Sequence, residues 1–388
     1  MVLFLHNRYR TSGGEERVVE ELMALVRDRL GEPVQLLARD SAELGRARAA
    51  AGLLRGGLAP SDVGKAVRVT GARVLHAHNL NPLFGWRALA AAKGVGARVV
   101  LHLHQYRLVC ATGVCFTDDE ECVRCHGRNT LPGVIHNCRG SRAEALAYGA
   151  SLALWQRRLT DQADAVIVPS AFARERLHEL GAPLRDERVH IVPPPVRLSE
   201  RPAVVESGTY ALVVSRLAPE KGVDVAIDAC RVAGVPLVVA GDGLERYDVG
   251  RSDRESIEES ADRPLGGAGG GNGDIPVRFV GRVDDAELAR LRAGAALAIV
   301  PSRSAETFGM AAAEAMAAGL PVVASRVGAL PELVPEEGLV KPGDADALAQ
   351  AIGRLWRDRD AGARARMRAS MACSPQMVAE RLQAVYDH

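Results

Sequence analysis

Short, continuous runs of β-branched and aliphatic residues recur along the chain, separated by longer amphipathic stretches. In the first half the runs occupy residues 2–6, 34–38, 73–78, 98–104, 165–170 and 189–194. In the second half they occupy residues 210–216, 236–243, 277–282, 297–302 and 321–326. Runs that are apolar at successive positions are typical of strands buried on both faces of a parallel sheet covered by helices. The pattern therefore predicts an α/β protein with two doubly wound, Rossmann-like domains.

A proline-rich stretch, residues 193–208, separates the two sets of runs and holds few residues suited to a core. The chain of 388 residues also exceeds the size at which one hydrophobic core usually keeps growing. We therefore predict an N-terminal domain over residues 1–195 and a C-terminal domain over residues 196–373, joined by a hinge. The last helix, residues 374–388, is expected to pack back on the first domain. The carboxyl ends of the two sheets would face each other across a cleft, where open α/β sheets bind ligands.

Composition narrows the class of protein. With 47% hydrophobic and 25% charged residues, the chain is expected to be globular. Its apolar runs are shorter than the roughly 18 residues that a membrane-spanning helix needs, and the apolar start is too short for a signal peptide. We therefore expect a cytoplasmic protein. The glycine-rich stretch PLGGAGGGNGD, residues 264–274, is expected to be a flexible surface insertion without a chemical role.

Charge is distributed unevenly along the chain. Lys and Arg outnumber Asp and Glu in residues 1–200, and the reverse holds in residues 201–388. A basic first half would suit an anionic acceptor, or peripheral contact with an acidic membrane surface at its inner face. Solvated arginines of an arginine-rich protein would give the same balance. No feature of the sequence points to a nucleic-acid partner.

The stretch SAETFGMAAAEAM, residues 304–316, places two carboxylates, Glu306 and Glu314, eight positions apart. The preceding strand and the following alanine-rich run put Glu306 in a loop at the carboxyl edge of a sheet and Glu314 about one turn into a helix. Free backbone N–H groups at the helix start, near Gly309 and Met310, would attract an anion. A nearby carboxylate would accept hydrogen bonds from sugar or ribose hydroxyls. The alternatives are a loop-capping Glu306 and a solvated Glu314.

A second motif, SRLAPEKGVD at residues 215–224, directly follows a predicted strand. Arg216 and Lys221 lie five positions apart across a Pro-Glu turn at the expected start of a helix. Two cations and a helix N-terminus at one place would suit a diphosphate. Lysine is rare in this chain, with only four against 45 arginines, which makes Lys221 more notable. A solvated turn is the alternative.

A third motif is the Gly-Gly step after the first strand. Gly13 and Gly14 would let the backbone approach a phosphate closely, although two glycines alone are a weak signal. No strand is followed by a full GxGxxG pattern with an acid about 20 residues later, which argues against a nicotinamide-dependent dehydrogenase.

Together these motifs resemble family 4 of the retaining, GT-B-fold glycosyltransferases (glycosyl transferases group 1), over essentially the whole chain. The resemblance implies that Glu314 holds the ribose hydroxyls of a sugar nucleotide and that Glu306 contacts the donor sugar. Arg216 and Lys221 would bind the diphosphate. Further donor contacts are implied for the glycine loop, the turn after a strand and the helix start: Gly13, Gly14, Arg282, Phe308, Gly309 and Met310.

Members with a similar first half often carry a His-Asp-Tyr-like step after the fourth strand. Here the step reads His104-Gln105-Tyr106. By this resemblance His104 would be a catalytic residue that orients the acceptor or the transferring sugar. Gln105 replaces the usual acid, so any step that relies on a carboxylate at this point is lost. A histidine satisfied within the core is the alternative.

The resemblance implies a hexosyltransferase that moves a sugar from a UDP- or GDP-sugar to a hydroxyl of a lipid, a polysaccharide or a small molecule. Cell-envelope polysaccharide, glycolipid or natural-product glycoside synthesis would fit. Residues 1–195 would hold the acceptor, and residues 196–373 the donor nucleotide. A retaining enzyme without a well-placed nucleophile would work by front-face substitution, in which the leaving diphosphate takes the acceptor proton. No aspartate-rich motif for a donor-bound Mg²⁺ is evident, so we expect metal-independent transfer.

Two alternatives stay open. A non-catalytic sugar-nucleotide sensor or scaffold would keep donor binding without transfer. A GT-B-fold sugar-nucleotide epimerase would place its acid and base carboxylates in a different local pattern from the one described here.

Five of the seven cysteines fall within 29 residues of an insertion that spans residues 105–142. One Cys-x-x-Cys pair, Cys122 and Cys125, with Cys110 and Cys138 on either side, would supply four thiolates for a structural zinc ion. Cys115, His126 and His136 are spare candidate ligands. Disulfides and free packed thiols are the alternatives. In each case the insertion would shape the acceptor side and would not take part in the chemistry.

Overall fold

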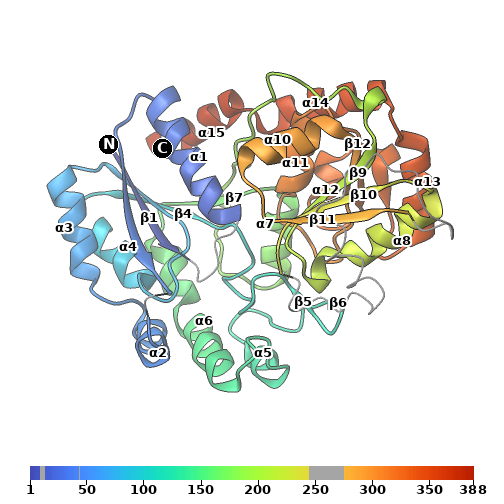
Figure 1. The fold of residues 1–388 in the computed structure, drawn as a ribbon. Coiled ribbons are helices and arrows are strands. Elements are labelled where there is room, and N and C mark those ends of the chain that lie inside the picture. Colours follow the sequence, from blue (N-terminus) through green and yellow to red (C-terminus); the bar gives the residue numbers. More distant parts are fainter. Residues whose placement is uncertain (9–13, 43, 244–274) are drawn as a thin grey trace. The chain divides into compact units, whose positions relative to one another are not determined.

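The computed structural model describes residues 1–8, 14–42, 44–243 and 275–388 (Figure 1). Gly13 and the glycine-rich stretch 264–274, both singled out in the sequence, lie outside the described residues. The chain divides into two compact units. Unit 1 comprises Met1–Thr117, Glu121–Pro195 and Pro375–His388, and unit 2 comprises Asp118–Glu120 and Val196–Ser374.

Unit 1 is built on a six-stranded parallel sheet with the order β2-β1-β3-β4-β7-β8. Its strands are β1 (Val2–Arg8), β2 (Val34–Asp40), β3 (Val74–Ala77), β4 (Arg98–His102), β7 (Ala165–Val168) and β8 (Val189–Ile191). Strands β3 and β7 are buried at every residue and β1 at every residue except Arg8, because helices cover both faces of the sheet. This confirms the parallel α/β architecture predicted from the continuous apolar runs.

The helices of unit 1 are α1 (Gly14–Arg29), α2 (Arg46–Arg55), α3 (Pro60–Thr70), α4 (Gly85–Lys93), α5 (Leu131–Ile135), α6 (Arg142–Gln162), α7 (Ala171–Glu179) and α15 (Pro375–Asp387). Helices α3 and α4 pack their apolar side chains against one face of the sheet. The last helix, α15, belongs to unit 1: Nε of Arg98 in β4 donates to the carbonyl oxygen of Val385 (3.0 Å). The insertion adds a two-stranded sheet of β5 (Phe116–Thr117) and β6 (Glu120–Glu121).

Unit 2 repeats the scheme with a six-stranded parallel sheet of order β11-β10-β9-β12-β13-β14. Its strands are β9 (Tyr210–Val214), β10 (Leu237–Ala240), β11 (Val277–Gly281), β12 (Ala295–Val300), β13 (Val322–Ser325) and β14 (Leu339–Val340). Each of the five apolar runs predicted for this half overlaps a strand. The edge strand β14 was missed, because two residues give too short a run to stand out.

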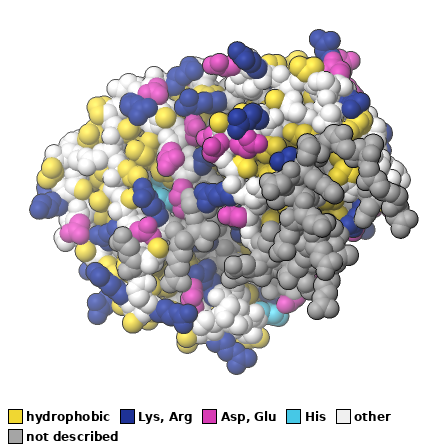
Figure 2. Space-filling model, viewed as in Figure 1, with side chains coloured by type: hydrophobic (Ala, Val, Ile, Leu, Met, Phe, Trp, Pro, Cys, Tyr) yellow, Lys and Arg dark blue, Asp and Glu magenta, His cyan; other side chains and the backbone are white. Residues whose placement is uncertain are grey.

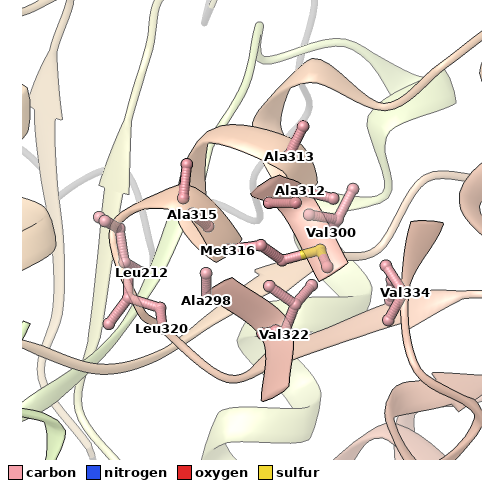
Figure 3. Close-up of a cluster of buried hydrophobic side chains, with 14 of the residues drawn as sticks. Leu212, Ala298, Val300, Ala312, Ala313, Ala315, Met316, Leu320, Val322 and Val334 are labelled. Atoms are coloured by element: carbon pink, nitrogen blue, oxygen red, sulfur yellow. The ribbon is translucent and has the colours of Figure 1, made fainter. Parts of the chain in front are cut away.

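The helices of unit 2 are α8 (Val223–Ala233), α10 (Asp285–Gly294), α11 (Met310–Ala317), α12 (Leu330–Leu333), α13 (Ala345–Leu355) and α14 (Arg359–Cys373). Side chains of α8 and α13 cover one face of the sheet, and those of α11 and α14 cover the other. Figure 3 shows Met316 of α11 with its sulfur directed toward Val300 of β12 and Val322 of β13. The small alanines of α11 let this helix approach the sheet closely, which fixes the position of its polar residue, Glu314.

None of the helices in the described part of the chain is long and apolar enough to cross a membrane. On the face shown in Figure 2, Lys and Arg side chains are scattered among other residues instead of forming one continuous patch.

Candidate active site

Glu306 lies in the loop between β12 and α11, as predicted, and the backbone of this loop is tightly held. The carbonyl oxygen of Glu306 accepts a hydrogen bond from the backbone N–H of Ala329 (2.8 Å). Gly328 has a left-handed φ of 59°, and a Cβ atom there would lie 2.3 Å from both the nitrogen and the oxygen of Glu306. Only glycine fits this contact, so the approach of the two backbone segments fixes where Glu306 stands.

The carboxylate of Glu306 is the centre of a polar cluster. Its Oε1 accepts hydrogen bonds from Nζ of Lys221 (2.6 Å) and from Oγ of Ser302 (2.7 Å). The Glu306 and Lys221 side chains are partly buried, with 18% and 20% of their surface exposed. The structure therefore brings two of the predicted site residues into direct contact, and the ion pair gives Glu306 a partner outside its own loop.

The charge state of Glu306 follows from these contacts. Burial alone would raise the pKa of its carboxyl group. The positive charge of Lys221, the hydrogen bonds from Lys221 and Ser302, and the charge of Arg216 act in the opposite direction and bring the pKa below its ordinary value. At neutral pH Glu306 is therefore an ionised acceptor of hydrogen bonds.

The two predicted cations lie on the segment that follows β9. Lys221 ends a short 3-10 helix, Pro219–Lys221, directly before α8. The turn after it needs glycine, because Gly222 has a φ of 64° and a Cβ there would lie 2.2 Å from the carbonyl oxygen of Pro301. Arg216 is 56% exposed, and its Nη2 donates to Oε1 of Glu220 (3.1 Å). Arg216 thus keeps a solvent-facing guanidinium near the partly buried Lys221–Glu306 pair.

Glu314 is the fifth residue of α11, and it does not face open solvent. Its side chain is 13% exposed, and its Oε2 accepts a hydrogen bond from Nη2 of Arg292, which is 14% exposed. Nε of Arg292 is buried and has no hydrogen-bond partner among the described residues. The alternative of a solvated helix position for Glu314 is therefore wrong.

The start of α11 is also held by backbone geometry. Gly309 precedes the helix with a φ of 97°, and a Cβ there would lie 2.6 Å from Cδ2 of Leu330. Phe308 is buried in the core of unit 2, and Met310 is the first residue of the helix. Arg282 is exposed at the residue after β11. Phe308 can therefore contribute only its backbone to a ligand without leaving the core.

In unit 1, Gly14 is the exposed first residue of α1, and its predicted companion Gly13 is among the residues not described. The other predicted residue, His104, belongs to a stack of histidines at the carboxyl ends of β3 and β4. Nε2 of His104 lies 2.8 Å from Nδ1 of His78, and its ring stacks on that of His102 at 4.3 Å. The sequence singled out His104 alone and missed the stack, although both histidine pairs, HAH and HLH, alternate as one face of a strand requires.

His76, His78 and His102 are buried, His104 is partly buried, and the stack continues to the last helix. Nε2 of His76 lies 3.2 Å from Nδ1 of His102, and Nδ1 of His76 lies 2.7 Å from the hydroxyl oxygen of Tyr386. Burial lowers the pKa of His76 to about 3 and also lowers the pKa values of His78, His102 and His104. These imidazoles are therefore neutral at pH 7.

Ring nitrogens of His76, His78 and His102 all lie within 4.8 Å of one another, which no other set of three potential metal ligands achieves in the described part of the chain. The His76 and His102 rings stack within 11° of parallel, and both nitrogens of His76 have hydrogen-bond contacts. A metal ion needs nitrogen lone pairs that converge in the ring planes. The arrangement therefore suits a packed, hydrogen-bonded stack better than a metal centre.

The five cysteines of the insertion lie close together around one cavity, and none of the seven cysteines of the chain forms a disulfide. One small cavity is lined by five of them and by a histidine: Cys110, Cys115, Cys122, Cys125, Cys138 and His136. Burial raises the pKa of Cys125 to about 11. The backbone of His126, the other spare ligand, forms an isolated antiparallel β-bridge with that of Asn129, and His126 does not line the cavity.

Sequence reasoning missed two side chains of the unit 2 site, Arg292 and Ser302. Arg292 lies in the last turn of α10, 22 positions before its partner Glu314, and no local spacing connects the two. Ser302 is the second residue after β12 and lies four positions before Glu306. A polar residue just after a buried strand was the available signal for Ser302.

Two family models match the sequence in succession. The glycosyl transferase 4-like domain matches residues 13–195, and the glycosyl transferases group 1 model matches residues 208–358. The boundary between them falls within the proline-rich stretch.

Curated relatives match parts of the chain. A D-inositol 3-phosphate glycosyltransferase of Nocardioides is 32% identical over 306 residues, which cover 69% of this chain and 63% of the relative. An MMP alpha-(1->4)-mannosyltransferase of Mycolicibacterium hassiacum is 45% identical over 113 residues, or 27% of each chain. A phosphatidyl-myo-inositol mannosyltransferase of Mycobacterium leprae is 37% identical over 143 residues, which cover 36% of this chain and 35% of that one. The chain thus spans less than two thirds of the length of these relatives.

Solved structures match over nearly the whole chain. HepE of Anabaena, in complex with UDP and glucose, is 20% identical with a TM-score of 0.62, and the match covers 99% of this chain and 98% of that one. Sucrose-phosphate synthase of Thermosynechococcus elongatus is 19% identical with a TM-score of 0.67 and the same coverage. These likenesses show the GT-B fold. Because family models match both units in succession, the chain belongs to the group 1 (family 4) glycosyltransferases.

Proposed function

We propose that this protein is a glycosyltransferase that moves a hexosyl group from a nucleoside-diphosphate sugar to a hydroxyl acceptor. The observation that carries the proposal is the Lys221–Glu306–Ser302 cluster at the carboxyl edge of the unit 2 sheet, with the Arg216 guanidinium nearby. The cluster combines two cations with a fixed, ionised carboxylate. A sugar diphosphate presents the matching groups, namely phosphate oxygens and sugar hydroxyls.

Within this site the chain's residues take distinct roles. The exposed Arg216 and the partly buried Lys221 would bind the diphosphate, and the helix start at Gly309 and Met310 would add backbone N–H donors. Glu306 would accept hydrogen bonds from the donor sugar, and Glu314 from the ribose. Backbone near Arg282 would contact the base. In unit 1, Gly14 would approach the phosphates, and His104 would orient the acceptor or the transferring sugar.

We further propose that transfer proceeds with retention by front-face substitution, without a catalytic metal. The bond between the sugar and the leaving diphosphate breaks as the acceptor oxygen bonds to the same face of the sugar, and the leaving phosphate takes the acceptor's proton. Lys221 and Arg216 would stabilise the charge that develops on that phosphate. Such catalysis relies on positioning and electrostatics, for which the rigid Glu306 loop is suited.

For the donor we propose a UDP- or GDP-sugar. Among the relatives, the Mycobacterium tuberculosis mannosyltransferase is named as GDP-mannose-dependent, and the Anabaena structure holds UDP and glucose. For the acceptor we propose a lipid, polysaccharide or small-molecule hydroxyl of cell-envelope or natural-product synthesis. A lipid acceptor would suit peripheral contact of the basic first half with an acidic membrane on its cytoplasmic side. Equal binding to neutral and acidic vesicles at low salt would contradict that contact.

The test is calorimetric binding of a panel of nucleoside diphosphates and their sugars to the purified protein, its Glu314→Ala variant and its Glu306→Ala variant. We expect one nucleotide to bind selectively, to bind more weakly to Glu314→Ala, and to bind normally to Glu306→Ala, which should lose transfer. Binding without transfer to any hydroxyl acceptor would favour a sugar-nucleotide sensor or scaffold. Conversion of the donor sugar to its epimer would favour an epimerase. No binding would overturn the donor site.

A further inference from the structure

The insertion between β4 and α6 has little regular structure of its own. Its elements are the two-residue strands β5 and β6 and the five-residue helix α5. Tyr106, Leu108 and Val109 near its start are buried, but Val123, Leu131 and Ile135 are more than half exposed. From residue 116 to residue 140 only Thr130 and Gly133 are buried. A segment that buries so little of its own side chains needs cross-links to hold one conformation.

The backbone of the insertion takes left-handed conformations at several non-glycine residues, of which one is unfavourable. Four non-glycine residues adopt left-handed φ values between 48° and 59°: Cys115, Asp118, Asp119 and Asn137. Aspartate and asparagine adopt this conformation readily as single residues, so the costly position is Cys115, at about 1 kcal/mol or more. Something other than local preference must therefore hold the backbone at Cys115.

The side chains that could supply this constraint share one cavity. Five cysteines and His136 line a space of about 20 Å³, which is room for about one water-sized sphere. The cysteines come from well-separated positions, from Cys110 to Cys138, and none is joined in a disulfide. A cavity of this size that is lined by six soft or borderline ligands is suited to a single metal ion.

We propose that this cavity is a structural Zn²⁺ site in which Cys110, Cys122, Cys125 and Cys138 supply four thiolates. Cys122 and Cys125 form a Cys-x-x-Cys pair, and the other two bring in the beginning and the end of the insertion. One ion would thus join residues 28 positions apart and replace the missing core. The proposal is independent of sugar transfer.

Two further cavity residues, Cys115 and His136, compete for places in this set. Cys115 is 1% exposed and its side chain is hydrogen-bonded to that of Cys110. It therefore suits a supporting role, as a hydrogen-bond donor to the Cys110 thiolate. His136 is exposed on the end of α5, so we leave it outside the set.

Binding would tighten the cluster. A tetrahedral ion with Zn–S bonds of about 2.3 Å holds its sulfurs about 3.8 Å apart. In the described chain no three cysteine sulfurs lie within 4.8 Å of one another, so the thiols would turn inward about their Cα–Cβ bonds. Each thiol loses its proton on binding, so zinc should be released as the pH falls.

The first experiment needs no variant. The full chain, purified under reducing conditions without chelator, should contain about one zinc per chain by elemental analysis. Titration with a mercurial in the presence of a zinc-sensitive dye should release it. Replacement by Co²⁺ should give the intense sulfur-to-metal charge-transfer absorption of a thiolate site. A zinc-free protein with five unpaired thiols in the insertion, or with disulfides there, would overturn the proposal.

Variants then test the ligand set. Single Cys→Ser changes at residues 110, 122, 125 and 138 should each lower the zinc content to less than half and weaken the charge-transfer band. Cys115→Ser should keep zinc, and so should Cys230→Ala, which alters a buried cysteine of unit 2. Loss of zinc in Cys115→Ser with retention in Cys110→Ser or Cys138→Ser would overturn the proposed set. Zinc content is compared among variants whose far-ultraviolet circular dichroism matches that of the parent.

Discussion

Nη2 of Arg292, in the last turn of α10, donates to Oε2 of Glu314 in α11, and both side chains are largely buried. The guanidinium holds one oxygen of the carboxylate, which fixes the direction in which the group faces. If Glu314 binds a ribose, as we propose, Arg292 acts as a positioning residue for it.

Replacing Arg292 should therefore weaken ribose recognition. We expect Arg292→Ala to reduce the affinity for the selected nucleoside diphosphate about tenfold, or about 1.4 kcal/mol. Affinity for the 2′,3′-dideoxy nucleotide should change much less, because that ligand makes no ribose hydroxyl contact. Calorimetry of both ligands measures the difference.

Arg290→Ala is the matched control for this prediction. Arg290 lies on the same helix, is 73% exposed and pairs with Glu287 of its own helix, so nucleotide affinity should not change. An equal loss for ribose and dideoxyribose ligands in Arg292→Ala would show that the arginine does not act through ribose recognition.

Lys221 should matter more for the rate of transfer than for donor binding. Its ammonium would stabilise charge that grows on the leaving phosphate, so Lys221→Ala should lower kcat by about 10²- to 10³-fold. The change also leaves the partly buried Glu306 carboxylate without its ionic partner. Steady-state kinetics with saturating donor, together with the dissociation constant of the nucleotide, separates the two effects.

Lys341→Ala provides a control in the same unit, since Lys341 is exposed after β14 and should leave kcat unchanged. A Lys221→Ala enzyme that keeps its kcat and loses only donor affinity would contradict the role at the leaving phosphate.

The sequence predicted the fold well because continuous apolar runs have few structural solutions. The runs at residues 210–216 and 297–302 became β9 and β12, neighbours in a parallel sheet. The loop position of Glu306 followed directly, since a polar stretch between a buried strand and a helix must lie at the carboxyl edge.

It was harder to predict which side chains contact one another than to predict where in the fold each residue lies. Lys221 and Glu306 are 85 residues apart, and only the order of strands in the sheet brings their segments together. Arg292 gave no signal at all, because one arginine among 45 is indistinguishable until its helix is packed. For His104, the alternative of a histidine that makes its hydrogen bonds within the core matches the observed stack. A chemical role for His104 stays a prediction.

Gly328→Ala should displace Glu306. The added Cβ would lie 2.3 Å from two backbone atoms of Glu306, in addition to the cost of a left-handed φ. We expect the free energy of unfolding to fall by about 3 kcal/mol in total, which is more than the 1–2 kcal/mol that the φ value alone costs. The rate of transfer should fall at least tenfold.

Gly343→Ala is the control that measures the cost of a left-handed φ alone. Gly343 has a φ of 75° and no atom within 4 Å of the added Cβ, so only the φ cost should appear, with transfer unchanged. Equal unfolding free energies for the two variants, measured by urea denaturation, would mean that the loop relaxes around the contact.

The histidine stack should make the protein sensitive to mild acid. Burial lowers the pKa values of His76, His78, His102 and His104 below their ordinary value of about 6.5. Below pH 6.5 the unfolded chain therefore binds protons that the folded chain refuses. Stability is full above that pH and falls as the pH decreases, by up to about 1.4 kcal/mol per pH unit for each histidine. For His76 the loss continues to about pH 3.

Urea unfolding at pH 7.5, 6.5 and 5.5 measures this slope, with tryptophan fluorescence as the signal because Trp86 and Trp155 belong to the same unit. His102→Gln should reduce the slope below pH 6.5 by close to one proton. His388→Gln, at the exposed end of the chain, should leave it unchanged. The free energy of unfolding of the parent protein should depend on pH more steeply than that of a variant lacking two of the stacked histidines. Equal slopes would mean that the stack takes up protons without unfolding.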